Sequence, residues 1–339
     1  MRKTILIATT MLLAFGCGAE FNGLPDAGPA KKADDPTPAP TPTPTPLPPP
    51  VDMGPGDASC GGMQFALARV PPNVMLVLDR SGSMNDSIGG GSATTKWSDL
   101  KAALQGLVTT YDSQMRLGAS IFSDDGNCGA GDITPLAAAN GSTIMSKVNA
   151  GGPAGNTPTA ATLDKVRTQG LLNDLNRDNV VVLATDGLPN CNDVDVAGKI
   201  AALYNATPSV KTYVIGVGDG TASDPTLLNA WADAGHTARP NATKYYQTNS
   251  PAELKQAFDA IAGGIVSCTF KMSQQAPDPS LLYVWSNGVS VPLDAMNGYT
   301  YDDLNDSVTL HGSACDALKT NPSTKVQVVY GCPGPPPIN

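Results

Sequence analysis

One short segment carries three oxygen-bearing side chains in a pattern that could hold a metal ion. Asp79, Ser81 and Ser83 alternate in the run Asp-Arg-Ser-Gly-Ser, directly after an apolar stretch at 73–78. A continuous apolar run of this length is typical of a strand buried on both faces of a parallel sheet. Carboxylates and hydroxyls offer the hard oxygen ligands that Mg²⁺ binds. Because open α/β sheets bind ligands at the carboxyl ends of their strands, the sequence predicts a metal site here.

Two later segments carry further oxygen ligands. Thr157 precedes a helical pattern, and a second apolar strand at 180–185 ends in Asp186-Gly187. In this order, Asp-x-Ser-x-Ser, a Thr and a strand-terminal Thr-Asp-Gly resemble the metal-ion-dependent adhesion site of von Willebrand factor A domains, the family that includes the integrin inserted domains. The resemblance extends over about residues 70–264. A polar strand-end turn is the alternative interpretation of the Asp-x-Ser-x-Ser run alone.

The resemblance implies a fold, an ion and a kind of partner. The fold is α/β, a doubly wound and mostly parallel sheet flanked by helices, with the metal at its carboxyl edge. The ion is Mg²⁺, with Mn²⁺ or Ca²⁺ as alternatives, and the partner is a protein that presents a carboxylate. The metal shell that the resemblance implies is Asp79, Ser81, Ser83, Thr157 and Asp186.

Metal-dependent binding of a protein is the function that this site favours, and we do not expect an enzyme. None of the three metal-binding segments contains a His, and no second acidic cluster offers a base, which disfavours a metal-dependent hydrolase. The glycine-rich run at 151–155 lacks the Lys of a phosphate-binding loop. A structural cell-envelope protein, in which the metal only stabilises the loops, is the remaining alternative.

Apolar strand runs alternate with amphipathic helix patterns through this region, which predicts a mostly parallel sheet covered on both faces. The expected strands are 73–78, 115–122, 180–185, 210–217 and 244–247, and the expected helices begin at Thr95 or cover 159–172, 195–205 and 224–234, with a last helix capped by Ser250. From Cys268 the runs become short and rich in Val, Tyr and Thr, which predicts a small β-rich module. Asn287-Gly288 and Asn297-Gly298 are hairpin signals within it.

The first 17 residues resemble the signal peptide of a bacterial lipoprotein. A basic start precedes an apolar segment at 4–15 that is too short to span a bilayer as a helix. The run ending in Gly16-Cys17 is similar to a lipoprotein cleavage box, with Leu13 one position further from the Cys than usual. We therefore expect a lipid on Cys17 and anchoring at the bacterial outer membrane or cell surface. An ordinary secretory signal, giving a periplasmic or secreted protein, is the alternative.

Composition limits the partners and divides the chain. Pro36–Pro50 is dominated by Thr-Pro repeats, which favour polyproline II and cannot form a packed core. The 339 residues include 21 Lys and Arg against 30 Asp and Glu, a balance that argues against nucleic acid as a partner. The predicted parts are a signal peptide with the lipidated Cys at 1–17, a disordered linker at 18–59, the A-type domain at 60–267, the β-rich module at 268–333 and a tail at 334–339.

Six of the seven cysteines follow Cys17, and an even number in an exported chain indicates disulfides. No Cys-x-x-Cys motif occurs and the chain has only two His, which argues against a structural zinc site. Six cysteines allow fifteen pairings, and partly free thiols are the alternative. The pairs that we favour are Cys60–Cys268 around the domain, Cys128–Cys191 in two loops at the metal-bearing edge, and Cys315–Cys332 in the tail.

Overall fold

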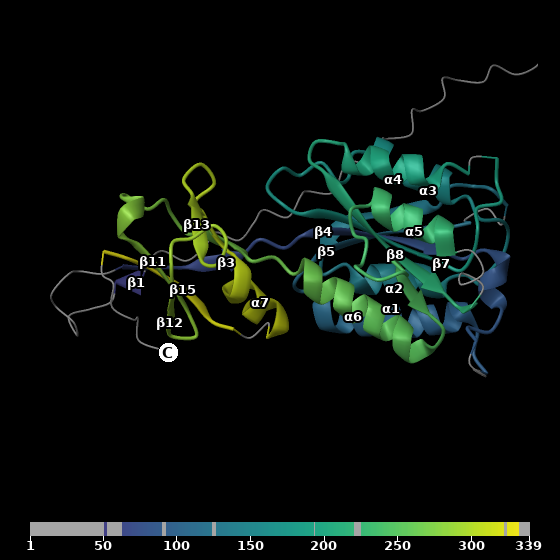
Figure 1. Ribbon diagram of the computed structural model, residues 1–339, viewed down its shortest axis with the longest axis horizontal. Coiled ribbons are helices and arrows are strands. Elements are labelled where there is room, and N and C mark those ends of the chain that lie inside the picture. Colours follow the sequence, from purple (N-terminus) through teal and green to yellow (C-terminus); the bar gives the residue numbers. More distant parts are fainter. Residues whose placement is uncertain are drawn as a thin grey trace, which may run out of the picture. The chain divides into compact units, whose positions relative to one another are not determined.

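Figure 1 shows the chain as a computed structural model. The structure describes residues 51–52, 63–89, 93–123, 127–192, 194–219, 225–321 and 324–331. The predicted signal peptide, Cys17, most of the linker, Cys60, Cys332 and the tail lie outside these residues. In the described part of the chain, no helix has both the length and the apolar character that crossing a bilayer requires.

A six-stranded sheet forms the centre of the α/β domain, in the order β6-β5-β4-β7-β8-β9. Every neighbouring pair is parallel except β5 and β6. The strands are β4 (Asn73–Asp79), β5 (Arg116–Phe122), β6 (Asp132–Ala138), β7 (Asn179–Thr185), β8 (Val210–Val217) and β9 (Tyr246–Thr248). The helices are α1 (Lys96–Tyr111), α2 (Gly141–Asn149), α3 (Thr159–Thr168), α4 (Val196–Tyr204), α5 (Pro225–Ala234) and α6 (Pro251–Ile265). The predicted mostly parallel, helix-flanked fold is confirmed.

The central strand β4 has a hydrophobic core on each side. Val74, Leu76 and Leu78 lie in a core with α1, α2 and α6, while Met75 and Val77 lie in a second core with α3, α4 and α5. Figure 1 shows these two sets of helices on opposite faces of the sheet. Every residue of β4 and of β7 is buried, because successive side chains of a strand point to opposite faces and both faces are covered.

Capping residues set where α1 and α6 begin. The side chain of Thr95 accepts a hydrogen bond from the Ser98 N–H at the start of α1. Ser250 accepts from the Glu253 N–H at the start of α6, and the Glu253 carboxylate accepts from the Asn249 N–H at 2.6 Å. Both helix starts agree with the sequence patterns.

Two antiparallel sheets make up the β-rich module, with the orders β1-β2-β15-β11-β12 and β13-β14-β10-β3. Their common core includes Phe65, Phe270, Val284, Val308 and Val328. The strands are β1 (Val51–Asp52), β2 (Met63–Phe65), β3 (Leu67–Arg69), β10 (Thr269–Met272), β11 (Leu282–Ser286), β12 (Val289–Val291), β13 (Tyr299–Asp302), β14 (Ser307–Leu310) and β15 (Val326–Tyr330), and α7 (Gly312–Thr320) follows β14.

The module also takes strands from before the α/β domain. β2 pairs with β15 and β3 pairs with β10, although the boundary expected at residue 60 assigns both to the α/β domain. β1, which lies in the predicted linker, pairs with β2. The Asn287-Gly288 turn joins β11 to β12 with positive φ angles of 47° and 78°, as predicted. The hairpin predicted at Asn297-Gly298 is wrong, because β12 and β13 on either side of it belong to different sheets.

Two disulfides join described cysteines. Cys128 pairs with Cys191 at a Cα–Cα distance of 5.9 Å, and these positions lie in two loops at the carboxyl edge of the large sheet. This is the pairing that the sequence favoured. Cys268 pairs with Cys315 at a Cα–Cα distance of 5.5 Å.

The second bridge shows that the predicted pairs Cys60–Cys268 and Cys315–Cys332 are wrong. Its cause is the pairing of β10 with β14, in which the Leu310 N–H donates to the Cys268 carbonyl at 3.0 Å. The chain then enters α7 directly, which brings Cys315 back to Cys268. The sequence patterns did not predict α7. A bridge within the tail, Cys315–Cys332, was therefore favoured.

Removing the Cys268–Cys315 bridge should destabilise the protein. It closes a loop with a sequence separation of 47 residues, for which the chain-entropy estimate is about 4 kcal/mol. We expect the Cys268→Ala/Cys315→Ala variant to unfold at lower urea concentration, with a free energy of unfolding reduced by up to about 4 kcal/mol. Peptide mapping without reductant should recover the Cys268 peptide linked to the Cys315 peptide, and a Cys60–Cys268 peptide would contradict this pairing.

Candidate functional site

The predicted carboxylates meet at the carboxyl edge of the large sheet. β4 and β7 are parallel neighbours with Leu78 opposite Ala184, so the residues that follow reach the same edge. Asp79 ends β4 and is fully buried, and Asp186 comes directly after β7 and is 3% exposed. The fold therefore brings together two acidic side chains that are far apart in the sequence.

Hydrogen bonds join four of the five predicted ligands into one cluster. Asp79 Oδ1 accepts from the Ser81 N–H at 2.8 Å, and the Ser81 and Ser83 hydroxyl oxygens are 3.2 Å apart. The Ser83 hydroxyl donates to Asp186 Oδ1 at 2.8 Å. Ser81 is buried whereas Ser83 is exposed, so the cluster opens to solvent at Ser83.

Thr157, the fifth predicted ligand, is buried on an adjoining loop. Its N–H donates to Asn190 Oδ1 at 2.7 Å, which ties it to the loop after β7. Two residues earlier, the Gly155 carbonyl accepts from the Gly82 N–H at 3.1 Å, which ties the same loop to the turn after β4. The disulfide at Cys191, next to Asn190, holds the same rim. All three predicted segments are thus joined to one another.

Two further side chains complete the cluster. The Thr185 hydroxyl donates to Asp79 Oδ2 at 2.6 Å. Lys96 Nζ donates to Asp186 Oδ2 at 2.8 Å and lies 3.5 Å from the Ser83 carbonyl oxygen. With these contacts, each of the four carboxylate oxygens of Asp79 and Asp186 has a hydrogen-bond donor.

Sequence reasoning missed both residues, although Lys96 carried a signal. Lys96, Leu100 and Leu104 follow one another at helical spacing on the buried face of α1. A Lys on a buried face needs a buried counter-charge, and this requirement could have pointed to an acidic partner. Thr185 stands directly before Asp186, and only the sheet geometry shows that its hydroxyl reaches Asp79.

Burial and the neighbouring carboxylate change the pKa of Asp79. Burial, and secondly the charge of Asp186, raise the pKa of Asp79 to about 6, while hydrogen bonds from Ser81 and Thr185 act in the opposite direction. Lys96 compensates only one of the two negative charges. A divalent cation would offset the remaining negative charge, and this largely buried set of carboxylate and hydroxyl oxygens fits a hard ion such as Mg²⁺.

A metal ion at this site would need hydroxyl ligands, because the cluster offers only two carboxylates. Among the described residues, no group of three or more His, Cys, Asp or Glu side chains could hold a metal ion. The two carboxylates need Ser81, Ser83 and Thr157 to complete a set of oxygen ligands. That these residues coordinate a metal stays a prediction.

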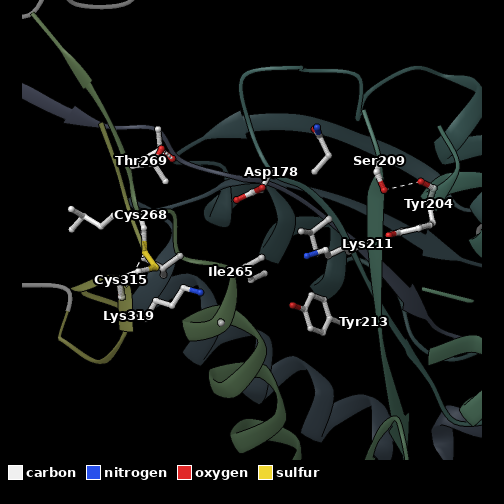
Figure 2. Close-up of a pocket in the computed structure, with 16 residues that line it drawn as sticks. Asp178, Tyr204, Ser209, Lys211, Tyr213, Ile265, Cys268, Thr269, Cys315 and Lys319 are labelled. Carbon is white, nitrogen blue, oxygen red and sulfur yellow. Dashed lines mark hydrogen bonds between the residues drawn. A yellow bond between two sulfur atoms is a disulfide. The ribbon is translucent and has the colours of Figure 1, made fainter. Parts of the chain in front are cut away.

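A cavity of about 500 Å³ lies elsewhere, at the amino ends of β7 and β8 (Figure 2). Its lining includes Asp178, Lys211, Lys319 and the Cys268–Cys315 disulfide. No residue of the predicted metal shell lines it. The sequence patterns did not predict this cavity, and Asp178 is the one carboxylate side chain among the described residues of its lining, so it lacks the paired carboxylates of the candidate metal site.

Residues 73–260 match the family model of the von Willebrand factor type A domain. The chain belongs to this family. The match covers more than half of the chain, from β4 into α6, and includes every residue of the candidate site. The family resemblance predicted from the sequence is therefore confirmed for the A-type domain.

Individual relatives are distant. YwmC, an uncharacterised protein of Bacillus subtilis, is 28% identical over 134 residues, which cover 37% of this chain and 58% of YwmC. The pilus adhesin SpaC of Lactobacillus rhamnosus GG is 14% identical with a TM-score of 0.46, covering 80% of this chain and 40% of SpaC. The manganese-loaded TRAP protein of Plasmodium vivax is 18% identical with a TM-score of 0.45, covering 80% of this chain and 99% of TRAP. The chain thus spans less than two thirds of YwmC and of SpaC, and the family assignment depends on the family model alone.

Asp79→Asn should stabilise the metal-free protein at neutral pH. Because folding raises the pKa of Asp79 from 3.8 to about 6, the stabilising effect of its proton is fully present below about pH 3.8 and is lost as the pH rises to about 6. Above that pH, the charged form costs about 3 kcal/mol. We expect the variant to gain up to about 3 kcal/mol in EDTA at pH 7.5 and much less at pH 4.5, measured by urea unfolding.

Asp86→Asn is the matched control, because Asp86 is an exposed carboxylate in the same segment. It should show no gain that depends on pH. An Asn at position 79 can still accept from the Ser81 N–H and donate to the Thr185 hydroxyl. Equal effects of Asp79→Asn at the two pH values would contradict the raised pKa.

Proposed function

We propose that this protein binds a protein partner in a metal-dependent way at the carboxyl edge of its large sheet. The observation that carries the proposal is the cluster of two buried carboxylates and several hydroxyls that opens to solvent at Ser83. The residues that would hold Mg²⁺, or Mn²⁺ or Ca²⁺ in its place, are Asp79, Ser81, Ser83, Thr157 and Asp186. When bound, the cation would attract a hard anionic group of the partner, such as a carboxylate.

The rest of the rim suits contact with a protein. Leu188 and Val194, on the loop after Asp186, are 50% and 59% exposed, so they would add apolar contacts around a bound anionic group. The Cys128–Cys191 disulfide holds this loop, which reduces the entropy lost when a partner binds. An adhesion-type role is the function that these features support.

We propose no enzymatic activity for the site. Neither His lies at the site, since His236 stacks on Tyr204 at the end of α4 and the His311 ring is hydrogen-bonded to Thr300 of β13. Asp79 and Asp186 are the proposed metal ligands, so neither carboxylate would be left as a general base within reach of a substrate. A purely structural role for the metal is the second candidate, and the exposure of Ser83 favours binding over it.

We also propose that the protein is exported and anchored by a lipid on Cys17 at the outer membrane or cell surface. The disulfides Cys128–Cys191 and Cys268–Cys315 support export, because disulfides persist in oxidising compartments.

Removing a charged ligand should weaken Mg²⁺ binding more than removing a hydroxyl ligand. We expect Asp79→Ala and Asp186→Ala to weaken Mg²⁺ binding on the order of 100-fold or more, and Ser81→Ala, Ser83→Ala or Thr157→Ala about tenfold. The reason is that only the two Asp bring formal negative charge to the proposed shell. Calorimetric titration with Mg²⁺ measures the affinities, and circular dichroism checks that each variant folds.

Capture of a partner from a surface extract should require the bound metal. Wild-type protein and the exposed control Asp86→Ala should retain a partner in Mg²⁺ and lose it in EDTA, while Asp79→Ala should retain none in either buffer. EDTA that lowers the unfolding temperature but leaves partner capture intact would favour the structural role. Full capture by metal-free Asp79→Ala would place recognition elsewhere on the chain.

Cys17→Ser should release the protein from the membrane fraction. A single lipidated Cys at the mature N-terminus would be the only covalent anchor in this proposal. Fractionation followed by immunoblotting should find wild-type protein with the membranes and the variant in the soluble periplasmic or culture fraction. Wild-type protein that is entirely soluble, with no acyl mass on its first peptide, would contradict the anchor.

A further inference from the structure

Lys96 places a cation inside the candidate metal site. Its Nζ donates to Asp186 Oδ2 at 2.8 Å, and the two side chains are only 7% and 0% exposed. For an ion pair so shielded from water, the attraction between the charges and further hydrogen bonds must offset the cost of desolvating both groups. Further hydrogen bonds contribute to this, since Nζ also reaches the Ser83 carbonyl and the Ser83 hydroxyl donates to Asp186 Oδ1.

The surrounding backbone is shaped to hold this side chain. Lys96 is the first residue of α1, and its N–H donates to the Asp86 carbonyl at 2.8 Å. Gly218, directly after β8, has a φ of +88°, and a Cβ on it would lie 2.7 Å from Lys96 Cε and 3.2 Å from the Ile88 carbonyl oxygen. A glycine is needed there, both for the backbone conformation and for the space that the Lys96 stem occupies.

A divalent cation in the same site would compete with this ammonium. With both carboxylates ionised, Asp79, Asp186 and Lys96 together leave one net negative charge in the buried cluster. A divalent cation held by Asp186 would either displace Lys96 from Oδ2 or lie close to its positive charge. Either change opposes binding, since like charges repel strongly where water is excluded.

We propose that Lys96 is a tethered counter-ion that holds the metal-free site together and lowers its affinity for divalent cations. This inference rests on the proposed metal site. In the metal-free chain, the ammonium neutralises Asp186 and keeps the rim assembled. In the loaded chain, the same ammonium leaves the site with a net positive charge, which suits an anionic group of the partner.

Lys96→Met tests the proposal, because Met removes the charge and leaves an unbranched side chain in the space beside Gly218. We expect it to bind Mg²⁺ about tenfold or more tightly than wild type in calorimetric titration. In EDTA it should unfold at lower urea concentration, because Asp186 then has no counter-charge. Lys101→Met, on the same helix but outside the cluster, is the matched control and should match wild type in both measurements.

Lys96→Gln is the second variant, since it keeps a hydrogen-bond donor without the charge and should also bind Mg²⁺ more tightly. A Lys96→Met protein that folds only when Mg²⁺ is present would support the proposal. Unchanged or weaker Mg²⁺ binding by both variants would overturn it, because Lys96 would then orient Asp186 rather than compete for it.

The outcome for wild type separates this proposal from the proposed function. If wild type binds no Mg²⁺ at millimolar concentration while Lys96→Met does, the metal-dependent function fails and the competing role of Lys96 stands. If neither protein binds Mg²⁺, both proposals fail.

Discussion

Two carboxylates buried side by side at the end of a parallel sheet are the constraint on which the site depends. Asp79 and Asp186 come together because β4 and β7 are neighbours that end at the same edge. Burying two negative charges is costly unless hydrogen bonds and a counter-charge compensate them. The turn after β4, the end of β7 and the start of α1 each supply a donor for this purpose. These three segments therefore all act to compensate the same two buried negative charges.

The fold makes this arrangement rigid. The hydrophobic cores on both faces of the sheet fix β4 and β7, so the ends of these strands stay side by side. Both ends of the α/β domain are also held, since β3 before it and β10 after it are paired strands, with Phe270 opposite Arg69. Just beyond this pair, the Val70 N–H donates to the Thr269 carbonyl at 2.9 Å. The domain is thus an insertion between adjacent strands of the β-rich module, and its chain ends cannot fray independently.

Much of the fold was predictable from the sequence because the central strands and capped helices have strong local patterns. The edge elements had weaker ones. β6 is half-exposed and contains Pro135, and α2 and α7 are short helices that begin without a side-chain cap; none of the three was predicted. The predicted partner of Cys268 was wrong because the true partner, Cys315, lies in α7, which was not predicted. At the site, Asp79, Ser81 and Asp186 lie together because they follow the ends of neighbouring strands, whereas the contact of Lys96 depends on where α1 begins relative to this edge of the sheet, which no local pattern specifies.

The counter-ion links the stability of the empty site to the chemistry of the partner. Without a divalent cation, Lys96 leaves the cluster with a single negative charge when both carboxylates are ionised, and the raised pKa of Asp79 reflects the cost of that charge in a buried place. A bound divalent cation would reverse the sign of the cluster to a single positive charge. One carboxylate from a partner would then bring the charge to zero, whereas a neutral group would leave it uncompensated in a largely buried place. With Lys96 present, metal and anionic partner would each bind better in the presence of the other, so the ammonium that stabilises the empty site would also favour an anionic ligand over a neutral one.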